Sequence, residues 1–238
     1  MARKPDPDAR RKLLQAARAT FAEVGVDAAR VEDVTHAAGL SKGAFYLHFE
    51  SKEAAFAELV AGFFAVLDEM VAEHHERLAE LRARMGAPTP ADWRGLTPRL
   101  RAYAELDHEN TVRVLRTLWR HRDMLGCILD ASGPRGHLVE RFFEVSRQTL
   151  SQQLEEAMRE GGLRDDLDRD LVSELLIGMY VQLGRRMVRA HERPDFDAWA
   201  RTVDGAMATY LHDPRAGIRS TAPPRLTPIE QRTERPPP

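Results

Sequence analysis

The chain has 238 residues, of which 43% are hydrophobic and 30% charged, enough for one large or two small globular domains. No apolar run is long enough to span a membrane, and the N-terminus lacks the apolar stretch of a secretory signal. The net charge of −2 argues against a polycation. The single cysteine, Cys127, excludes an internal disulfide framework and a cysteine-based zinc finger. We therefore expect a protein of the reducing cytoplasm.

The first expected helix begins at Asp6 and Pro7, a capping residue followed by a proline at the first helical position. It ends at Gly25, and its apolar face is formed by Leu13, Ala17, Phe21 and Val24. Residues 1–18 hold six basic side chains against two acidic ones, a net of +4, which leaves −6 for the rest of the chain. A basic segment on an acidic body predicts that a polyanion such as a DNA duplex contacts the N-terminal end.

Two short helices separated by a glycine turn are expected over residues 31–49. The apolar face of the first is formed by Val31, Val34 and Ala38. Gly39 suits the left-handed end of that helix, and Ser41 can cap the next one. There Phe45 and Phe49 are expected to point inward, and the outward residues are Lys42, Gly43, Ala44, Tyr46 and His48. A second helix that is small and polar at its N-terminal end predicts a helix-turn-helix that enters a major groove.

A continuous run in this region carries a family resemblance. It reads Ala38-Gly39-Leu40-Ser41-Lys42-Gly43-Ala44-Phe45-Tyr46-Leu47-His48-Phe49, followed by Ser51-Lys52-Glu53. This run resembles the DNA-binding signature of the tetracycline-repressor (TetR) family. The departures from the family pattern are Arg30 for Thr or Ser, Thr35 for Ala, Ala44 for Thr, and Ala55 for Leu. The missing hydroxyl at position 30 removes one phosphate contact, although an arginine there could contact phosphate itself.

The resemblance implies an all-α fold with a three-helix DNA-binding domain over residues 1–50 and a helical ligand-binding and dimerisation body over residues 51–212. At the tip of the second motif helix, Lys42 could donate to guanine or to a phosphate. Lys52, in the first turn of the next helix, suits a phosphate. The DNA-binding residues that we predict are Arg30, Ser41, Lys42, Gly43, Ala44, Tyr46, His48 and Lys52.

The body is also expected to be helical throughout. Its main helices are expected to begin at Ser51, Thr97-Pro98, Gly133-Pro134, Asp168 and Pro194-Asp195. Residues 169–191 are apolar over an arc wide enough to require burial on two sides. The last helix carries an apolar stripe of Phe196, Trp199, Val203, Met207 and Tyr210. We predict a homodimer through residues 169–211, where the family places a four-helix bundle; the alternative is that both helices are core helices of a monomer.

Residues 213–238 hold seven of the fourteen prolines and few large apolar residues, which predicts a disordered tail. Aromatic and methionine side chains of the body could line a cavity for an apolar or planar small molecule, although such residues are more often plain core. The candidate lining residues are Phe64, Tyr103, Trp119, Met124, Phe143, Tyr180 and Met187.

The sequence predicts no metal site, no cofactor and no enzymatic activity. His74 and His75 are adjacent, so a helix turns them too far apart to share an ion. The chain also lacks a nucleophile elbow, a His-Glu-x-x-His helix and a dinucleotide-binding loop. The resemblance to the TetR family instead implies a ligand-responsive repressor that binds a palindromic operator as a homodimer and is released by a small apolar or aromatic effector. The alternatives are a ligand-independent DNA-binding protein and an enzyme that carries a helix-turn-helix.

Overall fold

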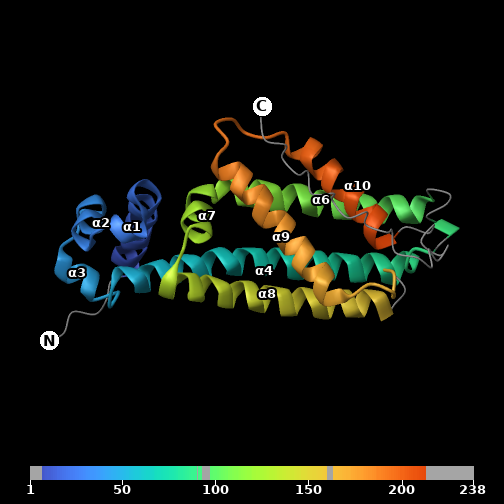
Figure 1. The fold of residues 1–238 in the computed structure, drawn as a ribbon, viewed down its shortest axis with the longest axis horizontal. Coiled ribbons are helices and arrows are strands. Elements are labelled where there is room, and N and C mark those ends of the chain that lie inside the picture. Colours follow the sequence, from blue (N-terminus) through green and yellow to red (C-terminus); the bar gives the residue numbers. More distant parts are fainter. Residues whose placement is uncertain (1–6, 90, 93–96, 160–162, 213–238) are drawn as a thin grey trace, which may run out of the picture.

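The computed structural model describes residues 7–89, 91–92, 97–159 and 163–212, and within them every regular element is a helix (Figure 1). The predicted all-α class is therefore confirmed. The helices are α1 Pro7–Ala28, α2 Val31–Ala38, α3 Lys42–Tyr46, α4 Lys52–Met85, α6 Pro98–Arg120, α7 Arg122–Leu129, α8 Gly133–Arg159, α9 Arg169–Val188 and α10 Phe196–His212. The tail predicted over residues 213–238 lies outside the described residues.

The molecule is elongated, with α1, α2 and α3 grouped at one end (Figure 1). Helix α4 leaves this group and runs the length of the body, with α8 beside it. Helices α6 and α10 pack on each other, and α9 contacts α8, α7 and α6. Because α4 is a continuous helix of 34 residues, it connects the N-terminal unit rigidly to the far end of the body.

Several predicted helix starts are confirmed by their caps. The hydroxyl of Ser51 accepts a hydrogen bond from the backbone of residue 54, and that of Thr97 accepts one from the backbone of residue 100. The carboxylate of Asp168 accepts from the backbone of residues 170 and 171. These acceptors satisfy amide groups that a helix start leaves unpaired. The predicted end of α9 at residue 191 is wrong, because the helix stops at Val188.

The core of the N-terminal unit extends past the predicted boundary at residue 50. Phe21 of α1 and Phe56 of α4 meet edge to face with their ring centroids 6.2 Å apart, and both are fully buried. The first turns of α4 thus complete the core of the three small helices. The prediction that Val24 shares the buried face is wrong, because the kink at Gly25 (φ 78°) leaves Val24 48% exposed and buries Val26 instead.

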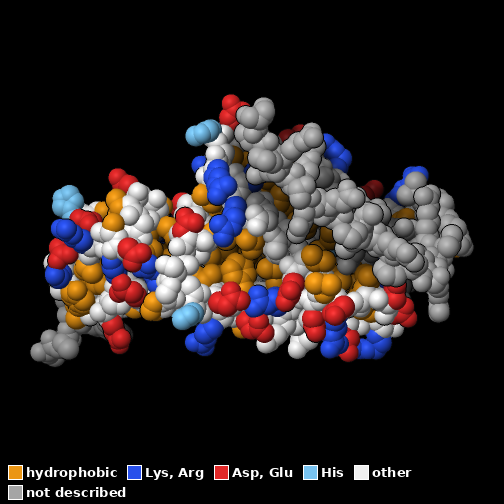
Figure 2. Space-filling view, in the orientation of Figure 1, with side chains coloured by type: hydrophobic (Ala, Val, Ile, Leu, Met, Phe, Trp, Pro, Cys, Tyr) orange, Lys and Arg blue, Asp and Glu red, His pale blue; other side chains and the backbone are white. Residues whose placement is uncertain are grey.

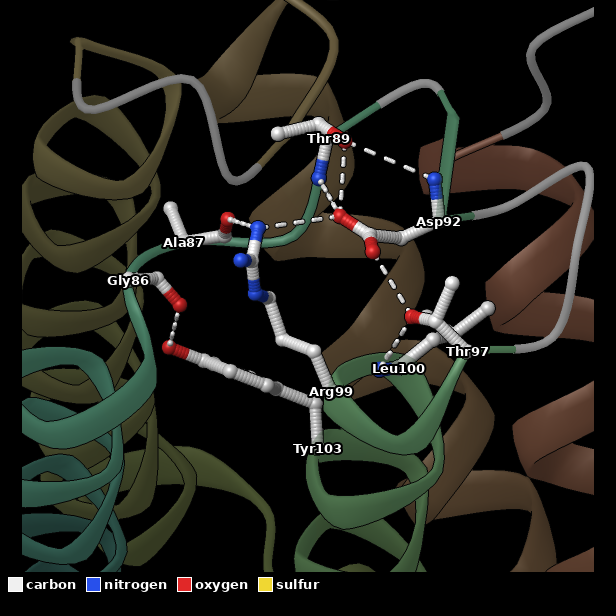
Figure 3. Close-up of polar contacts among 8 residues, drawn as sticks. All are labelled: Gly86, Ala87, Thr89, Asp92, Thr97, Arg99, Leu100 and Tyr103. Atoms are coloured by element: carbon white, nitrogen blue, oxygen red, sulfur yellow. Dashed lines mark hydrogen bonds and ion pairs between the residues drawn. The ribbon is translucent and has the colours of Figure 1, made fainter.

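The connection between α4 and α6 is organised around one carboxylate (Figure 3). The buried Asp92 side chain accepts hydrogen bonds from the backbone and hydroxyl of Thr89, at 2.7 and 2.6 Å, and from the hydroxyl of Thr97 at 2.7 Å. A nitrogen of the Arg99 guanidinium lies 3.2 Å from the same carboxylate. These donors, Thr89 first among them, hold the pKa of Asp92 far below its ordinary value.

We expect Asp92→Asn to lower the thermal stability of the protein at neutral pH, because the charged acceptor is lost. A carboxyl with a lowered folded-state pKa contributes stability that is present above the unfolded value of 3.8 and is lost as the pH falls through the folded-state pKa. The melting-temperature difference between wild type and variant should therefore shrink in acid. Thermal melts across the acidic range test this, with the exposed Asp165→Asn as control; a difference that is independent of pH would contradict it.

Candidate nucleic-acid interface

The turn between α2 and α3 has the geometry that a helix-turn-helix requires. Gly39 takes the left-handed conformation (φ 65°, ψ 31°), where a residue with a side chain would be strained. The Ser41 hydroxyl then accepts a hydrogen bond from the backbone of Ala44 at 3.2 Å and caps α3. Phe45 and Phe49 are buried, and their ring centroids lie 5.4 Å apart. This aromatic pair anchors α3 from behind and leaves its opposite face open.

Four of the eight predicted contact residues lie in α3, and His48 follows two residues after its end. Lys42 and Gly43 are exposed, and Tyr46 is 50% exposed. Ala44 and His48 are half-buried. Leu47, which the sequence did not single out, is 56% exposed beside Tyr46. Leu47 follows the last residue of α3 and lies between the buried Phe45 and Phe49, at a position that the aromatic pair leaves facing solvent.

The departure at position 30 is compensated within α2. The Arg30 side chain makes no capping bond, and the carboxylate of Asp33 instead accepts from the Arg30 backbone at 3.1 Å. Asp33 therefore satisfies an amide at the helix start. The Arg30 residue stays exposed, where its side chain can reach a phosphate.

Lys52 connects two parts of the N-terminal unit through hydrogen bonds. Its amino group donates to the carbonyl oxygens of Asp27, at 2.8 Å, and Ala29, at 2.9 Å. These bonds tie the connection between α1 and α2 to the start of α4. An ammonium group has three donors, so one N–H remains for a phosphate.

The basic N-terminal segment is largely compensated by acidic partners. Arg10 makes two hydrogen bonds to Glu58 of α4, while Arg11 and Lys12 pair with Asp8 in their own helix. Figure 2 shows basic and acidic side chains interspersed at the end of the molecule formed by α1, α2 and α3. Several of the basic side chains counted in the sequence are thus paired with acids. Within the described residues, this end of the molecule therefore offers less positive charge to a polyanion than the count for residues 1–18 suggests.

A second ion pair joins the N-terminal unit to the body. The Arg18 guanidinium of α1 donates to both carboxylate oxygens of Asp123 in α7, at 2.7 and 2.6 Å. Partial burial is the largest single influence on Asp123 and raises its pKa, but the bonds and charge of Arg18 together with the backbone amide of Met124 outweigh it and hold that pKa below its ordinary value. The pair is therefore charged at neutral pH and links α1 to α7.

Two open pockets border this junction. The larger, of about 870 Å³, is lined by the end of α1, by α7 and by side chains that include Cys127, Arg135 and Val188. The smaller, of about 280 Å³, lies between α1, α4 and α7 and is lined by Arg18 and Met124 among others. The larger volume falls within the ordinary range of small-molecule sites.

The structure does not bring the predicted ligand residues into one site. Phe64 stacks on Phe142 with ring centroids 5.0 Å apart and meets Phe143 edge to face at 5.3 Å. Tyr103 belongs to a separate cluster with Leu81 and Leu106. These side chains are in direct contact with their neighbours, as in a packed core.

The remaining candidates are spread over other contacts. Trp119 packs against Phe196 with ring centroids 6.3 Å apart, and Met187 is fully buried. The Tyr180 hydroxyl is deeply buried, and this burial raises its pKa to about 12. Met124 lines the smaller pocket at the junction.

Helix α9 presents apolar surface to solvent, whereas part of the apolar stripe predicted for the last helix is buried in α10. Leu171 and Leu175, one turn apart on α9, are each 50% exposed. Val203 of α10, a position suggested for the dimer contact, is only 7% exposed, so that expectation is wrong. Leu176 is half-buried against a cluster that contains Leu154. Leu171 and Leu175 are therefore the most exposed large apolar side chains that the structure describes on α9.

Neither a membrane-spanning helix nor a metal-binding cluster occurs among the described residues. No helix among them is both long and apolar enough to pass through a membrane. No group of three or more histidine, cysteine or acidic side chains in this part of the chain is arranged to hold a metal ion.

Comparison with known proteins gives consistent matches. The family described as "Bacterial regulatory proteins, tetR family" matches residues 13–59. The HTH-type transcriptional repressor KstR2 of Mycobacterium tuberculosis is 30% identical over 167 residues, covering 68% of this chain and 73% of that protein. The repressor AcnR of Corynebacterium diphtheriae is 31% identical over 175 residues, covering 69% and 90%. The structure of the fatty acid degradation regulator FadR from Bacillus halodurans shares the fold, with a TM-score of 0.64, 18% identity and coverage of 86% and 96%.

Proposed function

The chain belongs to the TetR family of bacterial transcriptional regulators, and from this premise we propose that it is a homodimeric repressor, released from a palindromic operator by a small apolar or aromatic effector. The observation that carries the proposal is the open face of α3, supported from behind by the buried Phe45 and Phe49. Such a protein acts on DNA in the cytoplasm and needs no catalytic group.

In the proposed complex, α3 lies in the major groove. Lys42 and Gly43 at its N-terminal tip approach base edges, while Tyr46 and His48 contact the backbone. Ser41 holds the start of α3, and Ala44 allows close approach. Flanking phosphates are bound by Arg30 and Lys52.

A dimer presents two such helices to one duplex. They must lie about 34–36 Å apart, or a multiple of one helical turn, to enter successive major grooves on one face. We place the dimer contact on α9 and α10, around the exposed Leu171 and Leu175. The two-fold symmetry of the dimer then accounts for a palindromic operator.

Release by an effector works through the elements that connect α3 to the body. These elements are the continuous helix α4 and ion pairs that include Arg18–Asp123 between α1 and α7 and Arg135–Asp27 between α8 and α1. A ligand bound beside one of these elements changes the equilibrium between two spacings of the paired α3 helices. It does so only as far as its affinities for the two arrangements differ, with a coupling free energy of ~1–3 kcal/mol. The pockets that border the Arg18–Asp123 junction are the places where we expect it.

A second candidate is a DNA-binding protein without an effector. The packing of Phe64 directly on Phe142 and Phe143 favours it, because these rings fill the part of the body where the sequence suggested a cavity.

Selection of bound fragments from randomised and genomic DNA by the purified full chain tests the proposal. We expect enrichment of a palindrome whose binding weakens with rising salt, as phosphate contacts require. An added effector should release it, and by reciprocity the operator should weaken effector binding by the same factor. Enrichment without release by any small molecule would support the second candidate, and no enrichment would overturn both.

A further inference from the structure

An ion pair lies on the surface proposed to face DNA. The Nζ atom of Lys42, the first residue of α3, is 2.5 Å from Oε1 of Glu32 in the first turn of α2. The two side chains are 56% and 57% exposed, so both are accessible to a ligand. The hydrogen bond between them lowers the pKa of Glu32 and raises that of Lys42, which keeps both groups charged.

A carboxylate at this position is unexpected on a surface that binds phosphate. Phosphates repel it, and a solvent-exposed ion pair contributes little to stability. The neighbouring acid Asp33 is explained, because it accepts from the Arg30 backbone at the start of α2. Glu32 also lies in the first turn of α2, where an acid is favourable and its own backbone amide contributes to the lowered pKa, but the first partner of its carboxylate is Lys42 on the next helix. In the major groove a carboxylate can accept a hydrogen bond only from an exocyclic amino group, on cytosine or on adenine.

We propose that Lys42 and Glu32 together read one G·C base pair, with Lys42 donating to guanine O6 and N7 and Glu32 accepting from cytosine N4. The proposal rests on the proposed function, since it assumes that α3 enters the major groove. Glu32 would then improve the choice of sequence, while its negative charge lowers the affinity of the protein for DNA of any sequence.

The order of groups along the base pair supports this assignment. The major-groove edge of G·C presents two adjacent acceptors on guanine and then one donor on cytosine. Lys42 gives one N–H to Glu32 and keeps two for the guanine acceptors, while Glu32 offers an oxygen to the cytosine donor. The edge of A·T alternates acceptor, donor and acceptor, and its thymine O4 would face the carboxylate unfavourably.

The test compares sequence preferences of the full-length wild type, Glu32→Ala and Lys42→Met in a randomised-DNA selection, followed by binding titrations. We expect wild type to prefer G·C at one position of each half-site, and each variant to lose roughly tenfold of that discrimination at the same position. The exposed Glu50→Ala serves as a control for removal of an acid from the same unit. Its preference should equal that of wild type. Circular dichroism checks that every variant is folded.

A modified base separates direct reading by Glu32 from mere positioning of Lys42. When the selected cytosine is replaced by its analogue without the N4 amino group, wild-type affinity should fall roughly tenfold more than the affinity of Glu32→Ala. Equal losses would overturn the proposal, as would a uniform rise in affinity of Glu32→Ala with an unchanged preference. If wild type enriches no sequence at all, the proposed function itself fails.

Discussion

Replacing Leu175 by glutamate is expected to make the protein monomeric and to lower its affinity for a palindromic operator by at least about a hundredfold. Leu175 and Leu171 form an exposed apolar strip on α9, and a charge in the centre of a desolvated contact is costly. A monomer binds one half-site at a time, so it loses the gain from linking two binding events.

Sedimentation gives the oligomeric state, and titrations of half-site and full-site duplexes give the loss of affinity. Val145→Glu is the matched control, because Val145 is also exposed, at 56%, but lies on α8 outside the proposed contact. Half-site affinity should be the same in both variants. A Leu175→Glu protein that sediments as a dimer, or a wild type that sediments as a monomer, would contradict the assembly that we propose.

Phe45→Ala should destabilise the N-terminal unit by about 3–5 kcal/mol, since it removes a fully buried aromatic ring. Phe45 contacts Phe49 and fixes α3 to the core shared by α1 and α4. With that anchor lost, α3 no longer presents a fixed surface, and operator binding should be lost as well. The helices of the distant α6–α10 contact should persist, because few contacts connect them to α3.

Denaturant titration measures the loss of stability, and hydrogen exchange shows where it occurs. Leu47→Ala is the control for stability: Leu47 lies two residues away but is 56% exposed, so its truncation should cost about 0.5 kcal/mol or less. Faster exchange throughout the chain in Phe45→Ala would show that the N-terminal unit and the body unfold together.

The local features of this protein were determined by its sequence. Gly39 turns the chain because only a residue without a side chain adopts its backbone conformation without strain. Ser51, Thr97 and Asp168 begin helices because their side chains pair with backbone groups two or three residues away. The inward placement of Phe45, and of Phe49 just beyond the end of α3, follows from their spacing of four residues in the local sequence. Each of these features depends on neighbours in the chain, so a short window contains its cause.

Contacts between distant residues were decided by the tertiary structure alone. The number of basic residues in the N-terminal segment did not indicate their partners. Arg10 pairs with Glu58 and Arg18 with Asp123, at separations of 48 and 105 residues along the chain. Helical spacing placed Val203 on an apolar stripe but did not say whether that stripe faces the core or a partner. Periodicity identifies an apolar face, whereas the packing partner of that face depends on how all the helices assemble.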